Sequence, residues 1–202
     1  MDKWFYVLIA SAAAGFGWVF GCPHGNFWVK LAVTVCALCG GALATGGAPT
    51  RREEWTGREV AVGMAAAIVL YGVFWLGDAA AARLFGFAPK QVEAIYAIRG
   101  LGNPWAVGAL LLLVTSPGEE LFWRGYVQRR VAGRWGGGTG VAAGAGLYAA
   151  VHLVSGNLML VAAAFVAGLF WCGLYRWRGS LTACIVSHAA WTVGVFLLFP
   201  IR

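Results

Sequence analysis

The sequence predicts an all-α membrane protein, a polytopic bundle of about seven transmembrane helices with one interfacial helix. Of the 202 residues, 60% are hydrophobic and 11% are charged. Soluble domains average about 25% charged residues, so this composition excludes a soluble fold. Apolar runs of bilayer length alternate with short polar turns. The 30 glycines suit helices that approach one another closely inside a membrane.

Three spans are predicted before residue 77. They cover residues 4–20, 27–44 and 59–76. A turn at 22–26 contains proline and glycine and separates the first two spans. The loop 45–58 carries arginine, glutamate and tryptophan side chains, a composition typical of the membrane interface.

Residues 77–103 mix charged and apolar side chains, unlike the spans on either side. Val92, Ile95 and Tyr96 recur at helical spacing, which indicates a helix lying on the membrane surface. We expect this segment to be an interfacial connector, and a lid or substrate-guiding element is the alternative. The sequence does not distinguish a segment that crosses the bilayer from one that lies on it.

Four further spans are predicted over residues 104–131, 141–153, 158–175 and 181–199. Pro104 stands where a first helical turn tolerates proline, and Pro117 predicts a kink. The glycine-rich stretch 136–140 predicts a flexible turn. We divide this one membrane domain into N-terminal spans with the interfacial segment, residues 1–103, and a C-terminal helical core, residues 104–202.

The distribution of lysine and arginine predicts the orientation. Seven spans put nine basic residues on the side of the N-terminus and five on the other, leaving out Arg124 as a buried candidate. Because basic residues concentrate in cytoplasmic loops, the N-terminus is predicted to face the cytoplasm. The net charge of +7 is dispersed between spans, which argues against nucleic-acid binding.

Two adjacent carboxylates are the strongest functional signal. Glu119 and Glu120 follow the apolar run 109–114 in a chain with only eight acidic residues. Ionisable groups inside a membrane are costly and are therefore functional candidates. Glu120 and Arg124 are four residues apart, so they share a helix face and can form an ion pair. Glu119 points about 100° away and is available for another partner.

Two histidines fall within predicted spans, His152 in the fifth and His188 in the seventh. A buried histidine is often a core residue, but inside a membrane it needs a polar partner. Tyr148 lies one turn before His152, and Thr192 lies one turn after His188. Counted from the N-terminal side, Glu119 and His152 both lie roughly 20 Å along their helices. We expect Glu119, His152 and His188 to share a cavity open to the cytoplasm.

This pattern resembles the CPBP family, the CAAX-processing and bacteriocin-processing membrane peptidases, also called Abi or glutamic-type intramembrane proteases. The resemblance covers about residues 105–196. The motifs that carry it are Glu119-Glu120-x-x-x-Arg124-Gly125, Tyr148-x-x-x-His152 and the late intramembrane His188. The family usually has phenylalanine where this chain has Tyr148, and asparagine where it has Thr192.

The resemblance implies a role for each catalytic side chain. Glu119, with His152, would activate water as the general base. His188, with Thr192 or a nearby backbone N–H group, would stabilise the tetrahedral oxyanion. Because Thr192 offers a shorter hydroxyl in place of the family amide, we expect the oxyanion to be held differently here.

Glu120, Arg124 and Tyr148 are expected to support the site by holding its helices and the catalytic carboxylate. The family generally works without a catalytic metal, so the resemblance implies no cofactor. Zinc is the alternative, because the carboxylate and the two imidazoles of the catalytic set form a ligand set that zinc accepts.

The leading prediction is a membrane-embedded, glutamate-dependent endopeptidase. It would cleave a membrane-anchored protein or peptide, by sorting-tail, bacteriocin-type or CAAX-type processing. The expected location is the bacterial inner membrane, because the abundance of Ala, Gly, Arg and Trp resembles that of a high-GC bacterium. The expected partners are this substrate and the lipid bilayer. Two alternatives are a non-catalytic scaffold or immunity protein of the same fold and a proton-coupled transporter.

Overall fold

The computed structural model describes residues 1–47 and 54–201. The chain is 86% helical and has no strand within these residues, which confirms the all-α prediction. Seven helices in the described part of the chain are long and apolar enough to cross a membrane. They run as Lys3–Gly21, Phe27–Ala44, Gly57–Leu84, Pro104–Trp135, Gly137–Ser155, Leu158–Arg178 and Leu181–Leu198. The chain is therefore a multi-pass membrane protein.

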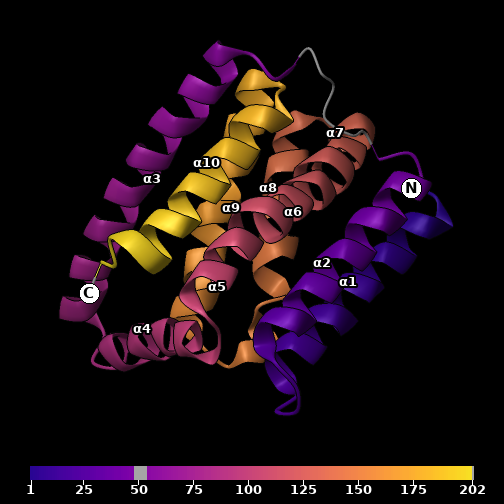
Figure 1. Ribbon diagram of the computed structural model, residues 1–202. Helices are drawn as coiled ribbons and strands as arrows, with labels where there is room; N and C mark the ends of the chain where they lie inside the picture. Colours follow the sequence, from indigo (N-terminus) through magenta and orange to yellow (C-terminus); the bar gives the residue numbers. More distant parts are fainter. Residues whose placement is uncertain (48–53, 202) are drawn as a thin grey trace.

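Figure 1 shows these spans as a bundle of steeply inclined helices. The first three spans are α1 (Lys3–Gly21), α2 (Phe27–Ala44) and α3 (Gly57–Leu84). The fourth contains α5 (Pro104–Leu110), α6 (Ser116–Phe122) and α7 (Arg129–Trp135). The last three are α8 (Gly137–Ala150), α9 (Leu158–Arg178) and α10 (Leu181–Val193), of which α8 ends in a 3₁₀ turn and α10 in a π-helical turn.

Side-chain caps fix where several of these helices begin. The capping residues are Asn26, Thr56, Asn103, Asn157 and Ser180, whose side-chain oxygens accept hydrogen bonds from backbone N–H groups of the first turn. These N–H groups have no partner within the helix, so each cap stabilises a helix start at the membrane edge.

The third span is longer than predicted. We predicted its end at residue 76, but α3 continues to Leu84 over 28 residues. A helix of this length measures about 42 Å and exceeds the hydrocarbon core of about 30 Å, so its last turns reach the headgroup region. Asp78 and Arg83 therefore belong to the helix end. The helix predicted to lie at the interface is α4 (Ala88–Ala97), which is shorter than the predicted segment and lies across the lower end of the other helices (Figure 1).

The fourth span is continuous from Pro104 to Trp135, but two π-helical turns interrupt its α-helical pattern. These turns cover Leu111–Thr115 and Trp123–Gln128, and α6 lies between them. The first ends two residues before Pro117, where we predicted an irregularity. π-turns often occur at functional sites because they shift the angular position of the side chains that follow. The side chains of the short helix α6, including Glu119 and Glu120, are therefore rotated about the helix axis relative to those of α5 and α7.

Close packing holds α6 against α2 and α10 against α3. A Cβ atom on Gly118 would lie 2.4 Å from Cγ1 of Val35, and one on Gly63 would lie 2.7 Å from Cβ of Val186. Only glycine permits these approaches. The division of the chain at residue 103 stays a prediction.

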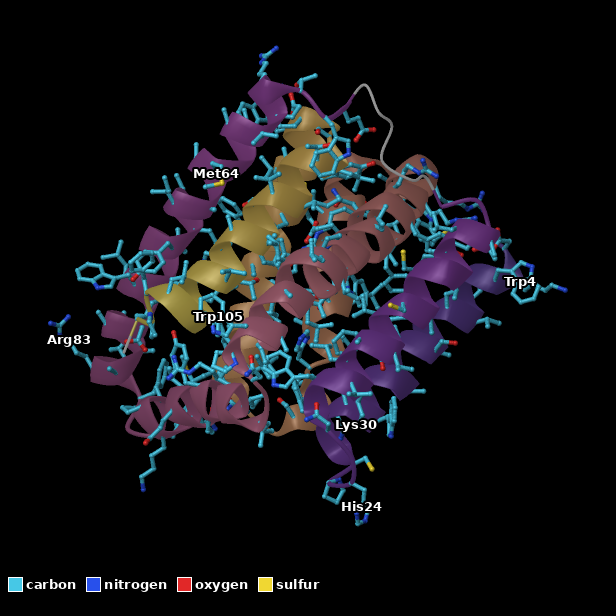
Figure 2. All side chains as sticks on the ribbon, in the orientation of Figure 1. Trp4, His24, Lys30, Met64, Arg83 and Trp105 are labelled. Atoms are coloured by element: carbon cyan, nitrogen blue, oxygen red, sulfur yellow. The ribbon has the colours of Figure 1, made fainter. Side chains whose placement is uncertain are left out.

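The end of the bundle that contains Lys3, here the N-terminal end, is held together by arginines. Arg129 donates a hydrogen bond of 2.9 Å to the backbone carbonyl of Gly46, and Arg130 pairs with Asp2 at 2.6 Å. Phe5 N–H and Arg130 lower the pKa of the Asp2 carboxyl below its ordinary value. The opposite end contains the turn 22–26 and α4, and we call it the mouth end. Figure 2 shows His24 and Lys30 there, far from Trp4.

Candidate active site

The acidic pair lies near the middle of the 32-residue fourth span. Glu119 is 9% exposed and Glu120 is fully buried. Buried carboxylates are costly unless charged or polar groups compensate them. The partners of each carboxylate therefore define the site.

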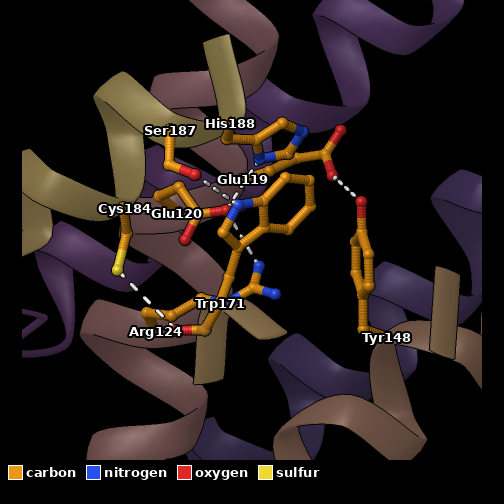
Figure 3. A network of polar contacts seen from close by, with 8 residues as sticks. All are labelled: Glu119, Glu120, Arg124, Tyr148, Trp171, Cys184, Ser187 and His188. Atoms are coloured by element: carbon orange, nitrogen blue, oxygen red, sulfur yellow. Dashed lines mark hydrogen bonds and ion pairs between the residues drawn. The ribbon is translucent and has the colours of Figure 1, made fainter. Parts of the chain in front are cut away.

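Glu120 is bonded to two basic side chains through the same oxygen atom (Figure 3). Arg124 Nη1 donates to Glu120 Oε1 at 3.0 Å, which confirms the predicted ion pair. His188 Nδ1 lies 2.7 Å from the same Oε1. Because a carboxylate oxygen accepts hydrogen bonds, this nitrogen of His188 carries the proton. Glu120 therefore joins the fourth span to the seventh, a link that the sequence did not reveal.

Glu119 points to a different partner, as the helical geometry predicted. The hydroxyl of Tyr148 donates a hydrogen bond of 2.7 Å to Glu119 Oε2, as Figure 3 shows. This bond fixes one carboxylate oxygen and links the fourth span to the fifth. The family's usual phenylalanine could not form it, so Tyr148 adds a polar contact that the family pattern lacks.

His152 lies just beyond the last residue of α8, and its ring is held by backbone and aromatic contacts. Its Nδ1 lies 2.7 Å from the backbone carbonyl of Tyr148, which can only accept, so Nδ1 carries the proton. The rings of Phe16 and Phe20 have their centroids 5.2 and 5.6 Å from the imidazole. In the neutral ring Nε2 is therefore unprotonated and can accept a hydrogen bond.

Trp171 of α9 is a site residue that the sequence analysis missed. Its ring is stacked on the imidazole of His188, with centroids 3.9 Å apart and planes 18° apart. The indole N–H donates to Ser187 Oγ at 3.2 Å, which fixes the ring in place. The Arg124 guanidinium lies 5.3 Å from the same indole ring. Nothing in the sequence distinguishes Trp171 from the other ten tryptophans, since its partners come from other helices.

These side chains surround a cavity of about 180 Å³. Glu119, Tyr148, His152, Trp171, His188 and Thr192 all line it. The Thr192 hydroxyl is buried and has no hydrogen-bond partner within the described residues. It is therefore available to a bound molecule. The rest of the lining is largely apolar and comes from α1, α2, α4, the fourth span, α9 and the seventh span.

Residues 101–194 match a family model described as type II CAAX prenyl endopeptidase Rce1-like. This part of the chain belongs to the CPBP family. The match contains every predicted site residue of this chain, from Glu119 to Thr192. No curated protein matches the chain, and no solved structure does. The match supports, for this part of the chain, a membrane endopeptidase in general.

The expected joint roles of Glu119 with His152 on a water, and of His188 with Thr192 on an oxyanion, stay predictions. No direct hydrogen bond joins Glu119 to His152, or His188 to Thr192, within the described residues. Each histidine instead uses its Nδ1 on another partner. Glu119, His152, His188 and Thr192 all line the cavity. A bound water or peptide would therefore connect them in place of direct contacts.

The predicted position of the cavity mouth is wrong. We expected both the N-terminus and the mouth on the cytoplasmic side, hence at the same end of the bundle. The cavity instead extends from Glu119 to the mouth end, where Phe27 and Ile98 line it. The depth estimate failed because α8 ends at Ala150, so His152 has already reached the far side of its span.

The side chains proposed as zinc ligands are not gathered into a metal-ready cluster within the described residues. Within residues 1–47 and 54–201, no group of three or more histidine, cysteine, aspartate or glutamate side chains could hold a metal ion. The Nδ1 atoms of both site histidines are occupied by Tyr148 and Glu120. These contacts do not decide against zinc, because a zinc-bound histidine commonly donates its other ring N–H group to a carboxylate or a backbone carbonyl. Both the metal-free site and the zinc alternative stay predictions.

Replacement of Trp171 by leucine is expected to lower kcat by about three- to tenfold, because an aromatic pair contributes about 1 kcal/mol of positioning energy. KM should change little, since Trp171 would act through His188. Trp171→Phe keeps a stacked ring and should stay near wild type. Kinetic assays of both variants, with thermal melting as the folding check, test this. A rise in KM as large as the fall in kcat would contradict the positioning role. Equal effects of Trp171→Leu and Trp171→Phe would also contradict it.

Proposed function

We propose that the chain is an intramembrane endopeptidase that hydrolyses a peptide bond with water activated by Glu119. The observation that carries the proposal is the shared cavity. A buried carboxylate, two oriented imidazoles and an unpartnered hydroxyl line one space inside a segment of the CPBP family. Catalytic sites combine such groups so that proton transfer and charge stabilisation act on one bound carbonyl.

In the proposed reaction, Glu119 removes a proton from water as the water oxygen attacks the peptide carbonyl carbon. The unprotonated Nε2 of His152 would accept a second hydrogen bond from this water and so orient it. The tetrahedral intermediate then collapses, the C–N bond breaks, and Glu119 gives its proton to the leaving amine. The products are a new carboxyl and a new amino terminus, which accounts for all atoms of peptide and water.

The developing oxyanion would be stabilised by His188. Since Nδ1 of this ring already donates to Glu120, donation from Nε2 requires the doubly protonated imidazolium. Glu120 is a suitable counterion, and the cluster would then contain two carboxylates and two cations, Arg124 and His188. A cluster without net charge is the least costly arrangement in a low-dielectric interior.

Thr192 would contribute the second oxyanion donor. Thr192→Val keeps the side-chain shape and removes the hydroxyl, so cleavage should fall by about 10- to 100-fold. Thr192→Asn supplies the amide that the family usually has at this position and should retain activity. Initial rates of both variants are the measurement. Unchanged cleavage by Thr192→Val would remove Thr192 from the oxyanion site.

The substrate is proposed to be a membrane-anchored protein or peptide with apolar residues beside the scissile bond. A second cavity of about 490 Å³ between α3, α4, α9 and α10 shares Trp191, Thr192 and Phe196 with the first. It would hold the apolar part of the substrate. Sorting-tail, bacteriocin-type and CAAX-type processing all supply such substrates, and the bacterial inner membrane, with the N-terminus in the cytoplasm, stays the predicted setting.

The test compares new protein termini in membranes of cells that express the wild-type chain or the Glu119→Gln variant. A peptidase produces new amino termini in membrane-anchored proteins only with the wild-type chain. Cleavage of such a substrate by purified protein in liposomes should continue in the presence of EDTA, because no metal is proposed. A scaffold would yield no new termini with either chain. Proton uptake that depends on Glu119, without cleavage, would instead indicate a transporter.

A further inference from the structure

The catalytic cavity is accessible from one end of the bundle only. Beyond Glu119 on the way to the N-terminal end, the fourth span continues with the buried side chains of Trp123, Tyr126, Val127 and Gln128. Gln128 closes this layer with a hydrogen bond of 2.8 Å to the backbone carbonyl of Cys172. None of these four residues lines the cavity. The described residues thus seal the site from the N-terminal end.

The basic residues concentrate at that sealed end. In residues 1–47 and 54–201, seven lysines and arginines lie there, against four at the mouth end. The seven are Lys3, Arg58, Arg129, Arg130, Arg134, Arg176 and Arg178, and the four are Lys30, Arg83, Lys90 and Arg99. Three of those four lie in or beside α4, and the short mouth-end turns 22–26 and 151–157 contain neither lysine nor arginine. By the positive-inside rule the sealed end is cytoplasmic.

From these two observations we infer that the catalytic cavity receives its substrate from the non-cytoplasmic side of the membrane. This inference rests on the proposed function in assuming that the cavity binds a substrate. The orientation of the cavity in the membrane does not depend on that function. The substrate class is narrowed accordingly. It comprises membrane-anchored proteins or peptides whose scissile bond reaches the outer half of the bilayer, such as segments exposed there after export. Peptide bonds confined to the cytoplasmic surface would not reach Glu119.

A natural cysteine makes the orientation measurable. Cys22 is a partly exposed free thiol at the mouth end, between α1 and α2. Its matched control is Gly133→Cys in a Cys22→Ser background, because Gly133 lies on α7 at the N-terminal end and a Cβ atom there meets nothing within 4 Å. The probe is a membrane-impermeant maleimide, applied to spheroplasts before or after permeabilisation. The Cys22→Ser chain measures background labelling at the other cysteines.

In intact spheroplasts Cys22 should react to the extent that it does after permeabilisation, whereas the cysteine at position 133 should react only after permeabilisation. The reverse pattern, or equal labelling of both positions in intact spheroplasts, would overturn the inference. The Glu119→Gln variant should give the same labelling as the wild-type chain. If the inferred orientation is wrong, the maleimide labelling changes and the cleavage result does not. If the peptidase proposal is wrong, the wild-type chain cleaves no substrate and the labelling pattern is unaffected.

Discussion

Glu119→Gln is expected to reduce peptide cleavage by about 10³-fold, the largest loss among the single substitutions considered. Glutamine keeps the size of the side chain and can still accept the hydrogen bond from Tyr148, but it cannot take a proton from water. Loss of a positioned general base costs about 10² to 10⁴ in rate. The loss should appear in kcat, because the amide still fits the cavity. Initial rates with purified protein in liposomes are the measurement.

The matched control is Glu93→Gln on the exposed face of α4, which removes a carboxylate outside the cavity and should leave cleavage unchanged. Thermal melting of both variants separates loss of chemistry from loss of folding. Near-wild-type cleavage by Glu119→Gln would refute the assignment of the base. The base would then be sought in His188, whose Nδ1–H is oriented by the Glu120 carboxylate as in a nucleophile-activating triad.

Glu120→Gln is expected to have the largest effect on stability, lowering the free energy of unfolding by about 3 to 5 kcal/mol. The Arg124 guanidinium is fully buried, and its ion pair within the described residues is with Glu120. Removal of the carboxylate leaves a buried positive charge without compensation. It also removes the anion that faces His188 Nδ1. The measurement is the unfolding equilibrium or the melting temperature in detergent micelles.

A double variant provides the internal control. Glu120→Gln with Arg124→Met removes both charges, and a neutral pair of similar volume should recover much of the lost stability. The exposed Glu93→Gln change should have no measurable effect on melting. A loss of under about 1 kcal/mol in the single Glu120 variant, the range of a surface ion pair, would contradict the structural importance of the buried cluster.

The fold and part of the site follow from local features of the sequence. Span length, apolar composition and turn residues predicted seven helices and an interfacial helix, because these features act within one segment. The ion pair of Glu120 with Arg124 was predictable since both residues lie on one helix at a fixed spacing. The divergent direction of Glu119 followed from the same geometry.

Contacts between helices were not predictable in the same way. The bond of Glu120 to His188 and the stacking of Trp171 on that ring depend on how three spans pack together. The two π-helical turns also shift the register of the fourth span. Pro117 predicted an irregularity beside the first turn, but no residue pattern marked the second, Trp123–Gln128. The cavity mouth was assigned to the wrong end of the bundle. Counting residues places a side chain along its own helix, whereas access to the cavity depends on which end of the bundle the side chains of neighbouring helices close.

The bonded pair within the fourth span also bears on how the chain enters the bilayer. Glu120 and Arg124 are on one helix, so they can neutralise each other before any neighbouring span is present. The insertion machinery would then meet a segment whose remaining buried charge is Glu119, instead of one with three separate charges. The pair thus lowers the cost of delivering an acid to the centre of the membrane during biogenesis, and its carboxylate later bonds to His188.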